Sequence, residues 1–311
     1  MKVMLAPMEG VVDHLMRDML TRVGGFDQCV TEFVRVVDQK LPKKTFYRLC
    51  PELHNGGKTP AGVPVRVQLL GQHPEWLAEN ALTAIELGSP GVDLNFGCPA
   101  KTVNKSKGGA VLLQHTQTLF DIVRAVRDAV PDDKPVSAKI RLGYEDKSLA
   151  VENACAITEA GASELVVHAR TKTEGYKPPA YWEWIAKIKE HTDIPLVANG
   201  EIWSEDDAKL CMERSGVTSL MIGRGALALP NLANCIRNGD APMPWNELTS
   251  LLIDYSGYEI YGDKGRYYPN RIKQWCGYLK RQYQEADTLF SDIRRLTDAD
   301  DIVKVLRSYS Q

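Results

Sequence analysis

Residues 91–113 read GVDLNFGCPAKTVNKSKGGAVLL and place a cysteine directly after a short apolar run. The run at 92–94 ends at Asn95, and the chain then turns through Gly97, Cys98 and Pro99. Side chains on a loop that follows a strand, flanked by glycine and proline, face a ligand more often than a core. An isolated cysteine is more commonly an inert thiol, but this position favours a functional one. The rest of the chain would then hold a cofactor and a substrate against Cys98.

The alternation of apolar runs and amphipathic stretches continues from the N-terminus to about residue 237. We expect strands at 3–6, 29–32, 65–69, 92–94, 136–141, 164–168, 196–199 and 219–222. Helical patterns lie at 13–22, 74–87, 118–130, 148–160, 182–190 and 205–214. Pro74 with Glu75, and Ser204 with Asp207, are helix-start signals. Eight strands in this order predict an α/β fold, a (β/α)8 TIM barrel, with a doubly wound open sheet as the weaker alternative.

The C-terminal part of the chain has a different pattern. The segment 240–244 contains two prolines, and residues 245–311 contain no strand-like run. They read as three or four helices. We therefore expect a barrel over 1–240 followed by a small all-helical domain over 241–311.

Composition excludes several classes of protein. The chain has 311 residues and a formal net charge of −2, so overall charge does not indicate a nucleic-acid or membrane partner. Its seven cysteines are scattered without a CxxC pair, which argues against a metal site. No stretch approaches the roughly 20 apolar residues of a membrane span, and the N-terminal apolar run is too short for a signal peptide. We expect a cytoplasmic protein, monomeric, with free thiols.

The predicted strand ends carry the candidate site, because function in a barrel lies at the C-terminal ends of its strands. These ends are Pro7-Met8-Glu9, Glu32, Gln68, Asn95, Lys139 with Arg141, His168 with Arg170, Asn199-Gly200-Glu201 and Gly223-Arg224-Gly225. The last two loops, VANGEI at 197–202 and MIGRGAL at 221–227, fit a phosphate site that Arg224 could clamp. Tight turns without a ligand are the alternative for either loop alone.

Three of these residues leave more than one interpretation open. Gln68 could pair with the edge of a heterocycle or be a satisfied core amide. Lys139 could form a Schiff base, belong to a structural ion pair, or place a positive charge beside an electron-rich ring. It shares a strand face with Arg141, and two cations inside a barrel require an anionic partner. His168, taken alone, is more often structural than catalytic.

One basic segment stands out in the helical region. Between residues 264 and 281 lie six basic residues and no acidic one: Lys264, Arg266, Arg271, Lys273, Lys280 and Arg281. Tyr267, Tyr268, Trp275 and Tyr278 are interleaved with them. After Pro269 the sequence indicates a helix that buries Ile272, Cys276 and Leu279, with Arg271, Lys273, Gln274, Tyr278 and Lys280 on other sides. Such a face suits an RNA backbone with stacked bases, and a solvated helix face is the alternative.

Taken together, these motifs resemble the tRNA-dihydrouridine synthases. The matching segments are APMEG (6–10), TEF (31–33), VQLLG (67–71), DLNFGCPAKTV (93–103), GGAVLL (108–113), KIRLG (139–143), VVHART (166–171), NGEI (199–202) and MIGRGAL (221–227). The match runs the whole length. EFVRVVD at 32–38 and PNRIKQW at 269–275 resemble the bacterial C-type subfamily, which acts on uridine 16 of the tRNA D-loop.

The resemblance implies an FMN-bound barrel with a C-terminal tRNA-binding domain. It assigns the flavin to Pro7, Met8, Glu9, Gln68, Lys139, His168, Asn199, Gly200, Glu201, Gly223 and Arg224. It assigns tRNA contacts to Arg35, Asn95, Arg170, Tyr176, Arg271, Lys273 and Gln274. NADPH would reduce the flavin, hydride would add to uracil C6, and Cys98 would protonate C5 as the catalytic acid.

Two other functions remain open at this point. One is an FMN barrel that acts on a free pyrimidine, as dihydroorotate dehydrogenase does. The other is a tRNA-binding protein without catalysis. The extra basic helical domain argues against the first, and the convergence of a thiol, a lysine and two phosphate loops argues against the second.

Overall fold

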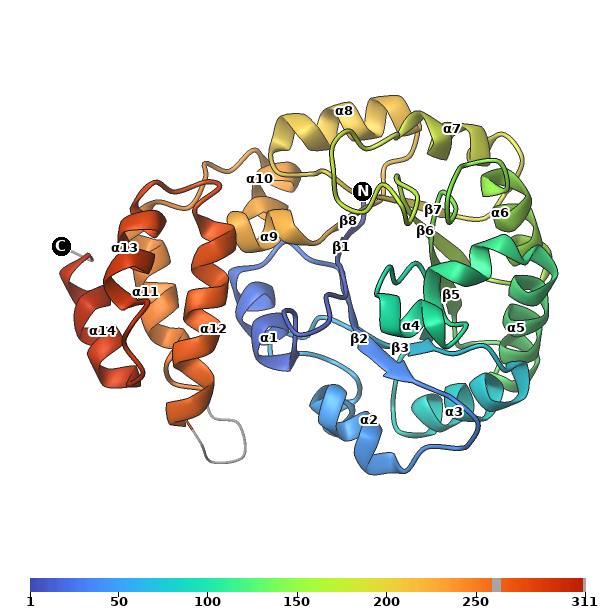
Figure 1. Cartoon of the computed structure of the whole chain (residues 1–311), viewed down its shortest axis with the longest axis horizontal. Coiled ribbons are helices and arrows are strands. Elements are labelled where there is room, and N and C mark those ends of the chain that lie inside the picture. The colour runs from blue at the N-terminus through green and yellow to red at the C-terminus, as the bar shows by residue number, and fades with distance from the viewer. Residues whose placement is uncertain (259–263, 310–311) are drawn as a thin grey trace.

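The computed structural model describes residues 1–258 and 264–309, and of residues 264–266 it describes the backbone alone. Eight parallel strands close into a barrel in chain order, with β1 paired to β8 (Figure 1). The strands are β1 (Val3–Leu5), β2 (Gln28–Arg35), β3 (Val65–Leu70), β4 (Val92–Phe96), β5 (Val136–Arg141), β6 (Glu164–His168), β7 (Leu196–Asn199) and β8 (Leu220–Ile222). The predicted TIM barrel is confirmed.

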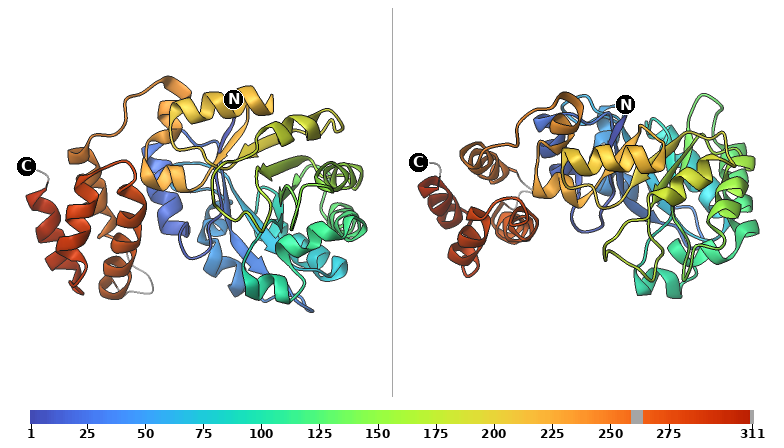
Figure 2. Two further views of the ribbon diagram at one scale, coloured as in Figure 1. Left: turned by 45° about the horizontal axis from the view of Figure 1, so that its top comes forward. Right: turned by 90° about the horizontal axis from the view of Figure 1, so that it is seen from above.

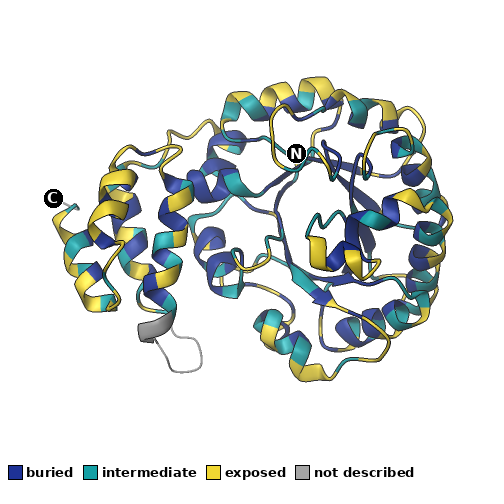
Figure 3. Cartoon of the chain, in the orientation of Figure 1, coloured by how far each residue is buried: buried dark blue, intermediate teal, exposed yellow. Residues whose placement is uncertain are grey.

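Helices form a ring around these strands and bury their inner faces against them (Figure 3). They are α1 (His14–Val23), α2 (Lys43–Leu49), α3 (Pro74–Glu86), α5 (Thr116–Ala129), α6 (Ala150–Glu159), α7 (Glu183–Lys189), α8 (Glu205–Ser215), α9 (Arg224–Ala228) and α10 (Leu232–Asn238). The short helix α4 (Lys101–Lys105) lies inside this ring (Figure 1). Two 3-10 turns, η1 (Pro51–Asn55) and η2 (Gly109–Gln114), complete the ring. Over the described residues, no helix combines the length and apolar character that a membrane span requires.

The helix-start signals read from the sequence have the expected local geometry. The Ser204 side chain accepts a hydrogen bond from the Asp207 N–H and caps α8, which ends at Gly216 in the left-handed conformation. Pro74 occupies the first position of α3, where its missing N–H has no consequence. Asp13 caps α1 in the same way as Ser204 caps α8.

The barrel interior is apolar on one side and polar on the other. The apolar side is a separate buried cluster of Met4, Ala6, Val30, Val166, Val197 and Met221. The polar side comes from β3, β4 and β5, whose inward residues include Gln68, Asp93, Asn95, Ser137 and Lys139. Beneath the C-terminal ends of the strands, the barrel therefore presents hydrogen-bonding groups from three adjacent strands.

The C-terminal helices are α11 (Trp245–Tyr255), α12 (Lys264–Leu279), α13 (Glu285–Ile293) and α14 (Ala299–Ser308). They pack together beside the barrel, with α12 nearest to it (Figures 1 and 2). Trp275 Nε1 donates to the Leu227 carbonyl of α9 at 3.0 Å, and Tyr267 donates to Asp13 of α1 at 2.8 Å. The predicted helical region is confirmed.

Several elements differ from their predicted bounds. Strands β2 and β4 extend beyond their predicted ends, and the short helices α2 and α4 were not predicted. Helix α12 begins at Lys264, and Pro269 lies inside it. A proline inside a helix costs about 3 kcal/mol, and α12 is held in place by buried contacts such as the Tyr268 hydroxyl bond to the Leu252 carbonyl. The predicted basic side chains of Lys264 and Arg266 lie outside the described part.

Candidate active site

Two adjoining cavities open at the C-terminal end of the barrel, one of about 480 Å³ and one of about 80 Å³. They share Pro7, Met8, Lys139, His168, Tyr176 and Arg224. The larger also contains Glu9, Gln68, Asn95 and Cys98, and the smaller contains Asn199, Gly200, Glu201 and Gly223. The structure thus brings the catalytic residue, all the cofactor residues and two of the tRNA residues assigned from sequence to one place.

Cys98 sits on a turn that is held from several directions. Asn95 Oδ1 accepts hydrogen bonds from the backbone N–H groups of Gly97, at 3.0 Å, and of Cys98, at 2.9 Å. Asn104 Nδ2 donates to the Cys98 carbonyl at 2.9 Å, and Arg141 Nε donates to the Gly97 carbonyl at 2.9 Å. Burial raises the pKa of the half-buried thiol, and the Glu9 carboxylate raises it further. Cys98 is therefore a protonated thiol at neutral pH and a potential proton donor.

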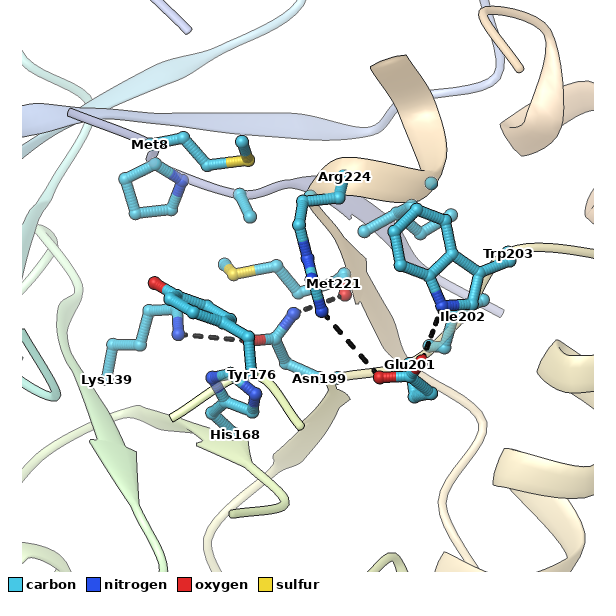
Figure 4. A pocket seen from close by; sticks show the side chains of 16 residues that line it. Met8, Lys139, His168, Tyr176, Asn199, Glu201, Ile202, Trp203, Met221 and Arg224 are labelled. Atoms are coloured by element: carbon cyan, nitrogen blue, oxygen red, sulfur yellow. Dashed lines mark hydrogen bonds and ion pairs between the residues drawn. The ribbon is translucent and has the colours of Figure 1, made fainter. Parts of the chain in front are cut away.

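Lys139 projects into both cavities from β5 and is oriented by β7 (Figure 4). Its Nζ donates to Asn199 Oδ1 at 3.0 Å, and Asn199 Nδ2 donates to the Met221 carbonyl at 2.8 Å. Burial, with the nearby Arg141, lowers the pKa of Lys139 to about 8. No carboxylate among the described residues forms an ion pair with it, so a structural ion pair does not explain this lysine.

His168 lines both cavities, and its ring is neutral. Burial, together with Arg141, Lys139, Arg170 and Arg224, keeps its pKa well below the usual value. Gly200 passes so close to it that a Cβ there would lie 2.8 Å from His168 Cδ2. His168 can therefore hydrogen-bond a ligand but cannot act as a cationic acid at neutral pH.

The loop after β7 carries a carboxylate surrounded by arginines. Glu201 adopts a left-handed φ of 59°, which disfavours a non-glycine residue, and its side chain accepts from Arg170 and from Trp203 Nε1 at 2.9 Å. Arg224 and Arg281 lie 3.7 Å and 3.9 Å from the same carboxylate. Three guanidinium groups against one carboxylate leave an excess of positive charge beside the smaller cavity, which suits an anionic ligand.

The loops after β7 and β8 touch each other. A Cβ on Gly225 would lie 2.1 Å from the Ile202 carbonyl oxygen, and one on Gly223 would lie 3.1 Å from Met8 Sδ. Glycine at these positions lets the two loops and the first loop of the barrel enclose the smaller cavity. This close approach gives a structural reason for the glycines that the sequence assigned to a phosphate site.

Several predicted substrate residues lie elsewhere. Arg170 is fully buried beneath the site, where it donates to Glu201 and, at 2.7 Å, to the Lys177 carbonyl. Arg35 is exposed at the rim and donates to Ser106 at 2.5 Å. Lys273 donates to the Leu296 carbonyl within the helical domain at 2.5 Å.

Arg271 and Gln274 join the helical domain to the first loop of the barrel. Arg271 donates to the carbonyls of Gly10, at 2.5 Å, and Val11, at 2.6 Å, and lies 3.1 Å from Asp13. Gln274 Nε2 also donates to the Gly10 carbonyl, at 3.0 Å. In this structure both side chains serve the domain contact.

The interpretation of the aromatic residues of α12 as base-stacking groups is wrong for two of them. Tyr268 and Trp275 are buried in the core, with Ile272, Cys276 and Leu279. Their polar atoms bond to backbone carbonyls, those of Leu252 and Leu227. Tyr278, in contrast, lines the larger cavity, so the helical domain supplies part of its wall.

Sequence reasoning missed other residues around the cavities. Trp203 lines the smaller one, and the guanidinium carbon of Arg281 lies 3.7 Å from the centre of a Trp203 ring. Phe33 lines the larger one beside Glu32, which the sequence did place at a strand end, although neighbours on a strand face opposite ways. The β2–β3 register shifts between Val30 and Phe33, and such a bulge re-aims side chains. Over the described residues, no group of three or more histidine, cysteine or acidic side chains could hold a metal.

Comparison with known structures identifies the fold. An old yellow enzyme homologue from Zymomonas mobilis matches with a TM-score of 0.53 at 12% identity, over 78% of this chain and 90% of that one. Morphinone reductase in complex with tetrahydroNAD matches with the same TM-score and identity, over 78% of this chain and 88% of that one. At this identity the likeness concerns the fold alone.

Comparison of sequences identifies the family. The model of the dihydrouridine synthase (Dus) family matches residues 4–304. The tRNA-dihydrouridine(16) synthase of Shewanella oneidensis is 62% identical over 306 residues, which are 98% of this chain and 97% of that protein. Its counterpart in Escherichia coli K12 is 52% identical, over 99% of this chain and 98% of that protein. The chain therefore belongs to the dihydrouridine synthase family of enzymes.

Proposed function

We propose that this enzyme reduces uridine 16 in the D-loop of tRNA to 5,6-dihydrouridine, with FMN as bound cofactor and NADPH as reductant. Residues 1–240 would bind the flavin and carry the chemistry, and residues 241–311 would bind tRNA. The enzyme would act as a cytoplasmic monomer. Its relatives carry the name tRNA-dihydrouridine(16) synthase, and the observation that supports the chemistry is that the half-buried Cys98 thiol lines the same cavity as Lys139 and Arg224.

The shape and donor set of the cavities fit FMN. A volume of about 480 Å³ lies within the range of roughly 300–1,000 Å³ that cofactor sites occupy. Gln68 and Lys139 offer donors to the carbonyl oxygens and ring nitrogens of a flavin, opposite the apolar Pro7 and Met8. The smaller cavity, with Arg224 and the glycine loops, would take the phosphate. Bound FMN would supply the hydride that adds to uracil C6.

Cys98 supplies the proton in this proposal. Addition at C6 leaves negative charge at C5 and O4 of the uracil, and C5 needs a proton to complete the reduction. The raised pKa of Cys98 keeps that proton on sulfur at neutral pH. Lys139 places a positive charge beside the reacting rings, since its pKa of about 8 leaves it mostly protonated at neutral pH.

Exposed cations on the segments that follow β2 and β4 support an RNA partner. Lys40, Lys43 and Lys44 lie at or just before α2, and Lys101, Lys105 and Lys107 lie on or beside α4. The Arg35–Ser106 bond links the end of β2 to the residue that follows α4. Within residues 1–258 and 264–309, no carboxylate forms an ion pair with any of these six lysines. Unpaired, exposed lysines at the end of the barrel where the pocket opens suit a phosphate backbone, which positions a nucleic acid without encoding its sequence.

Mapping dihydrouridine in cellular tRNA tests the proposal. A strain that lacks this gene should have uridine at position 16, and restoring the gene should restore dihydrouridine there. The purified protein should be yellow or become yellow with added FMN. No dihydrouridine at position 16 after restoration, or a protein that stays colourless with FMN, would contradict the proposal.

A further inference from the structure

Three polar side chains lie side by side in the interior of the barrel, and of these Gln68 alone lines the larger cavity. Gln68 on β3 pairs in register with Asp93 on β4, which pairs with Ser137 on β5. Their exposed fractions are 0%, 1% and 1%. Asp93 lines neither cavity, so no ligand contact explains a carboxylate at this position.

Hydrogen bonds run from this carboxylate to the turn that carries the thiol. Asp93 accepts from Ser137 Oγ and from Gln68 Nε2, each at 2.7 Å. Gln68 Oε1 accepts from Asn95 Nδ2, also at 2.7 Å. Asn95 Oδ1 accepts from the backbone N–H groups of Gly97 and Cys98. The chain of bonds crosses two strands and ends at the Cys98 backbone.

The two ends of this chain fix the orientation of both amides between them. The Asp93 carboxylate accepts from both Ser137 and Gln68, so the nitrogen of Gln68 faces Asp93 and its oxygen faces Asn95. Asn95 must then turn its nitrogen to Gln68 and its oxygen to the turn. The turn needs that oxygen, because backbone N–H groups only donate. Reversing either amide would place two donors or two acceptors against each other in a buried site.

We propose that Asp93 is a positioning residue that sets the orientation of the Gln68 and Asn95 amides and, through them, holds the turn that presents Cys98. The same hydrogen bonds also determine which side of the Gln68 amide faces the larger cavity. This second consequence rests on the proposed function, because it concerns the cofactor. The first concerns the thiol alone.

Asparagine and alanine at position 93 separate orientation from charge. In Asp93→Asn the new carbonyl can accept from Gln68 while its nitrogen donates to Ser137 Oγ, whose own hydrogen can go to the Val92 carbonyl, 3.3 Å away. The turn keeps this arrangement favourable, so Asp93→Asn should preserve the chain of bonds. Asp93→Ala removes the acceptor and frees both amides to reverse. Ser137→Ala is the matched control, since it removes one bond to Asp93 and leaves the Asp93–Gln68 bond.

The test measures iodoacetamide alkylation of Cys98 against pH, by peptide mapping, on the FMN-loaded variants. In Asp93→Ala the midpoint pH should fall by roughly half a unit or more, because a released turn lets water reach the thiol. The kcat for tRNA should fall by about tenfold or more with little change in KM. Asp93→Asn and Ser137→Ala should follow the wild type in both measurements.

Two results would overturn the inference. One is a folded Asp93→Ala whose alkylation profile and kcat match the wild type. The other is an Asp93→Asn whose midpoint pH and kcat fall as far as those of Asp93→Ala. The charge of Asp93, rather than the orientation of the amides, would then explain the effect. If Asp93→Ala does not fold, an Asp93→Asn whose midpoint pH or kcat departs from that of the wild type overturns the inference. Since alkylation needs neither tRNA nor turnover, a wild type that fails to reduce tRNA would contradict the proposed function and leave this test intact.

Discussion

Replacing Arg271 with alanine should loosen the helical domain from the barrel. Its guanidinium group bonds to two backbone carbonyls of the first barrel loop and pairs with Asp13. Only 13% of the Arg271 side chain is exposed, against 20% for Asp13. The bonds to Val11 and Asp13 are therefore partly shielded from water, whereas the bond to Gly10 is exposed, and each joins groups more than 250 residues apart in sequence.

The expected loss follows from these bonds. A hydrogen bond to a charged group contributes about 1.5–3 kcal/mol, and removing one partner leaves the others unsatisfied. Because the bonds of one side chain are not additive, the variant should lose roughly 2–4 kcal/mol of unfolding free energy in total. For a chain of this size that corresponds to a fall in melting temperature of roughly 3–6 °C.

Thermal melting and tRNA binding, measured together, test this expectation. Lys273→Ala is the control, because Lys273 makes its bond within the helical domain and should change melting little. Arg271→Ala should lower both the melting temperature and tRNA affinity. An Arg271→Ala that melts with the wild type and still loses tRNA affinity would show that Arg271 serves the RNA and not the domain contact.

Three further outcomes follow from the site. The rate of uridine reduction at saturating tRNA should decline as pH rises through about 8, where Lys139 loses its charge, and a flat profile across that pH would contradict this role. Gly225→Ala should weaken FMN binding by about tenfold or more, since its Cβ would lie 2.1 Å from the Ile202 oxygen. Joint replacement of Lys43 and Lys44 by glutamine should reduce the salt dependence of tRNA binding by about 0.7–0.9 for each phosphate that is no longer neutralised.

Matched variants serve as controls for the last two predictions, those for Gly225 and for Lys43 with Lys44. A Cβ on Gly277 would meet no atom within 4 Å, so Gly277→Ala should leave FMN affinity unchanged. Lys187 is exposed on α7, so Lys187→Gln should not alter the salt dependence. Normal FMN binding by Gly225→Ala, or an unchanged salt slope after replacement of Lys43 and Lys44, would contradict the respective roles.

The barrel and the positions of its functional residues could be predicted because they follow from chain order. Each strand is an apolar run that ends in a polar residue, and parallel closure brings all eight ends to one face. Gln68, Cys98, Lys139 and Gly223 therefore meet although they are far apart in sequence. Their proximity could be predicted without knowing any individual contact between them.

Features that depend on register or on packing between domains could not be predicted in this way. The bulge in β2 turns both Glu32 and Phe33 toward the cavity, against simple alternation. Arg170 follows β6 as expected but is drawn to Glu201, below the cavity.

The aromatic residues of α12 are a different case, because a signal was available. A helical period of 3.6 places Tyr268 and Trp275 on the same stripe as Ile272 and Leu279. The basic residues between them suggested an RNA-binding face instead. Arg271 likewise has a partner that only the folded chain reveals, since Asp13 caps the first helix of the barrel.

Single-turnover reduction of tRNA by Cys98→Ala tests the central claim most directly. The protein is loaded with FMN, reduced with NADPH and mixed with tRNA that lacks dihydrouridine. We predict that NADPH still reduces the flavin and that tRNA still binds, while dihydrouridine forms about 10²–10⁴-fold more slowly than in the wild type. Formation of dihydrouridine at the wild-type rate would show that Cys98 is not the proton donor.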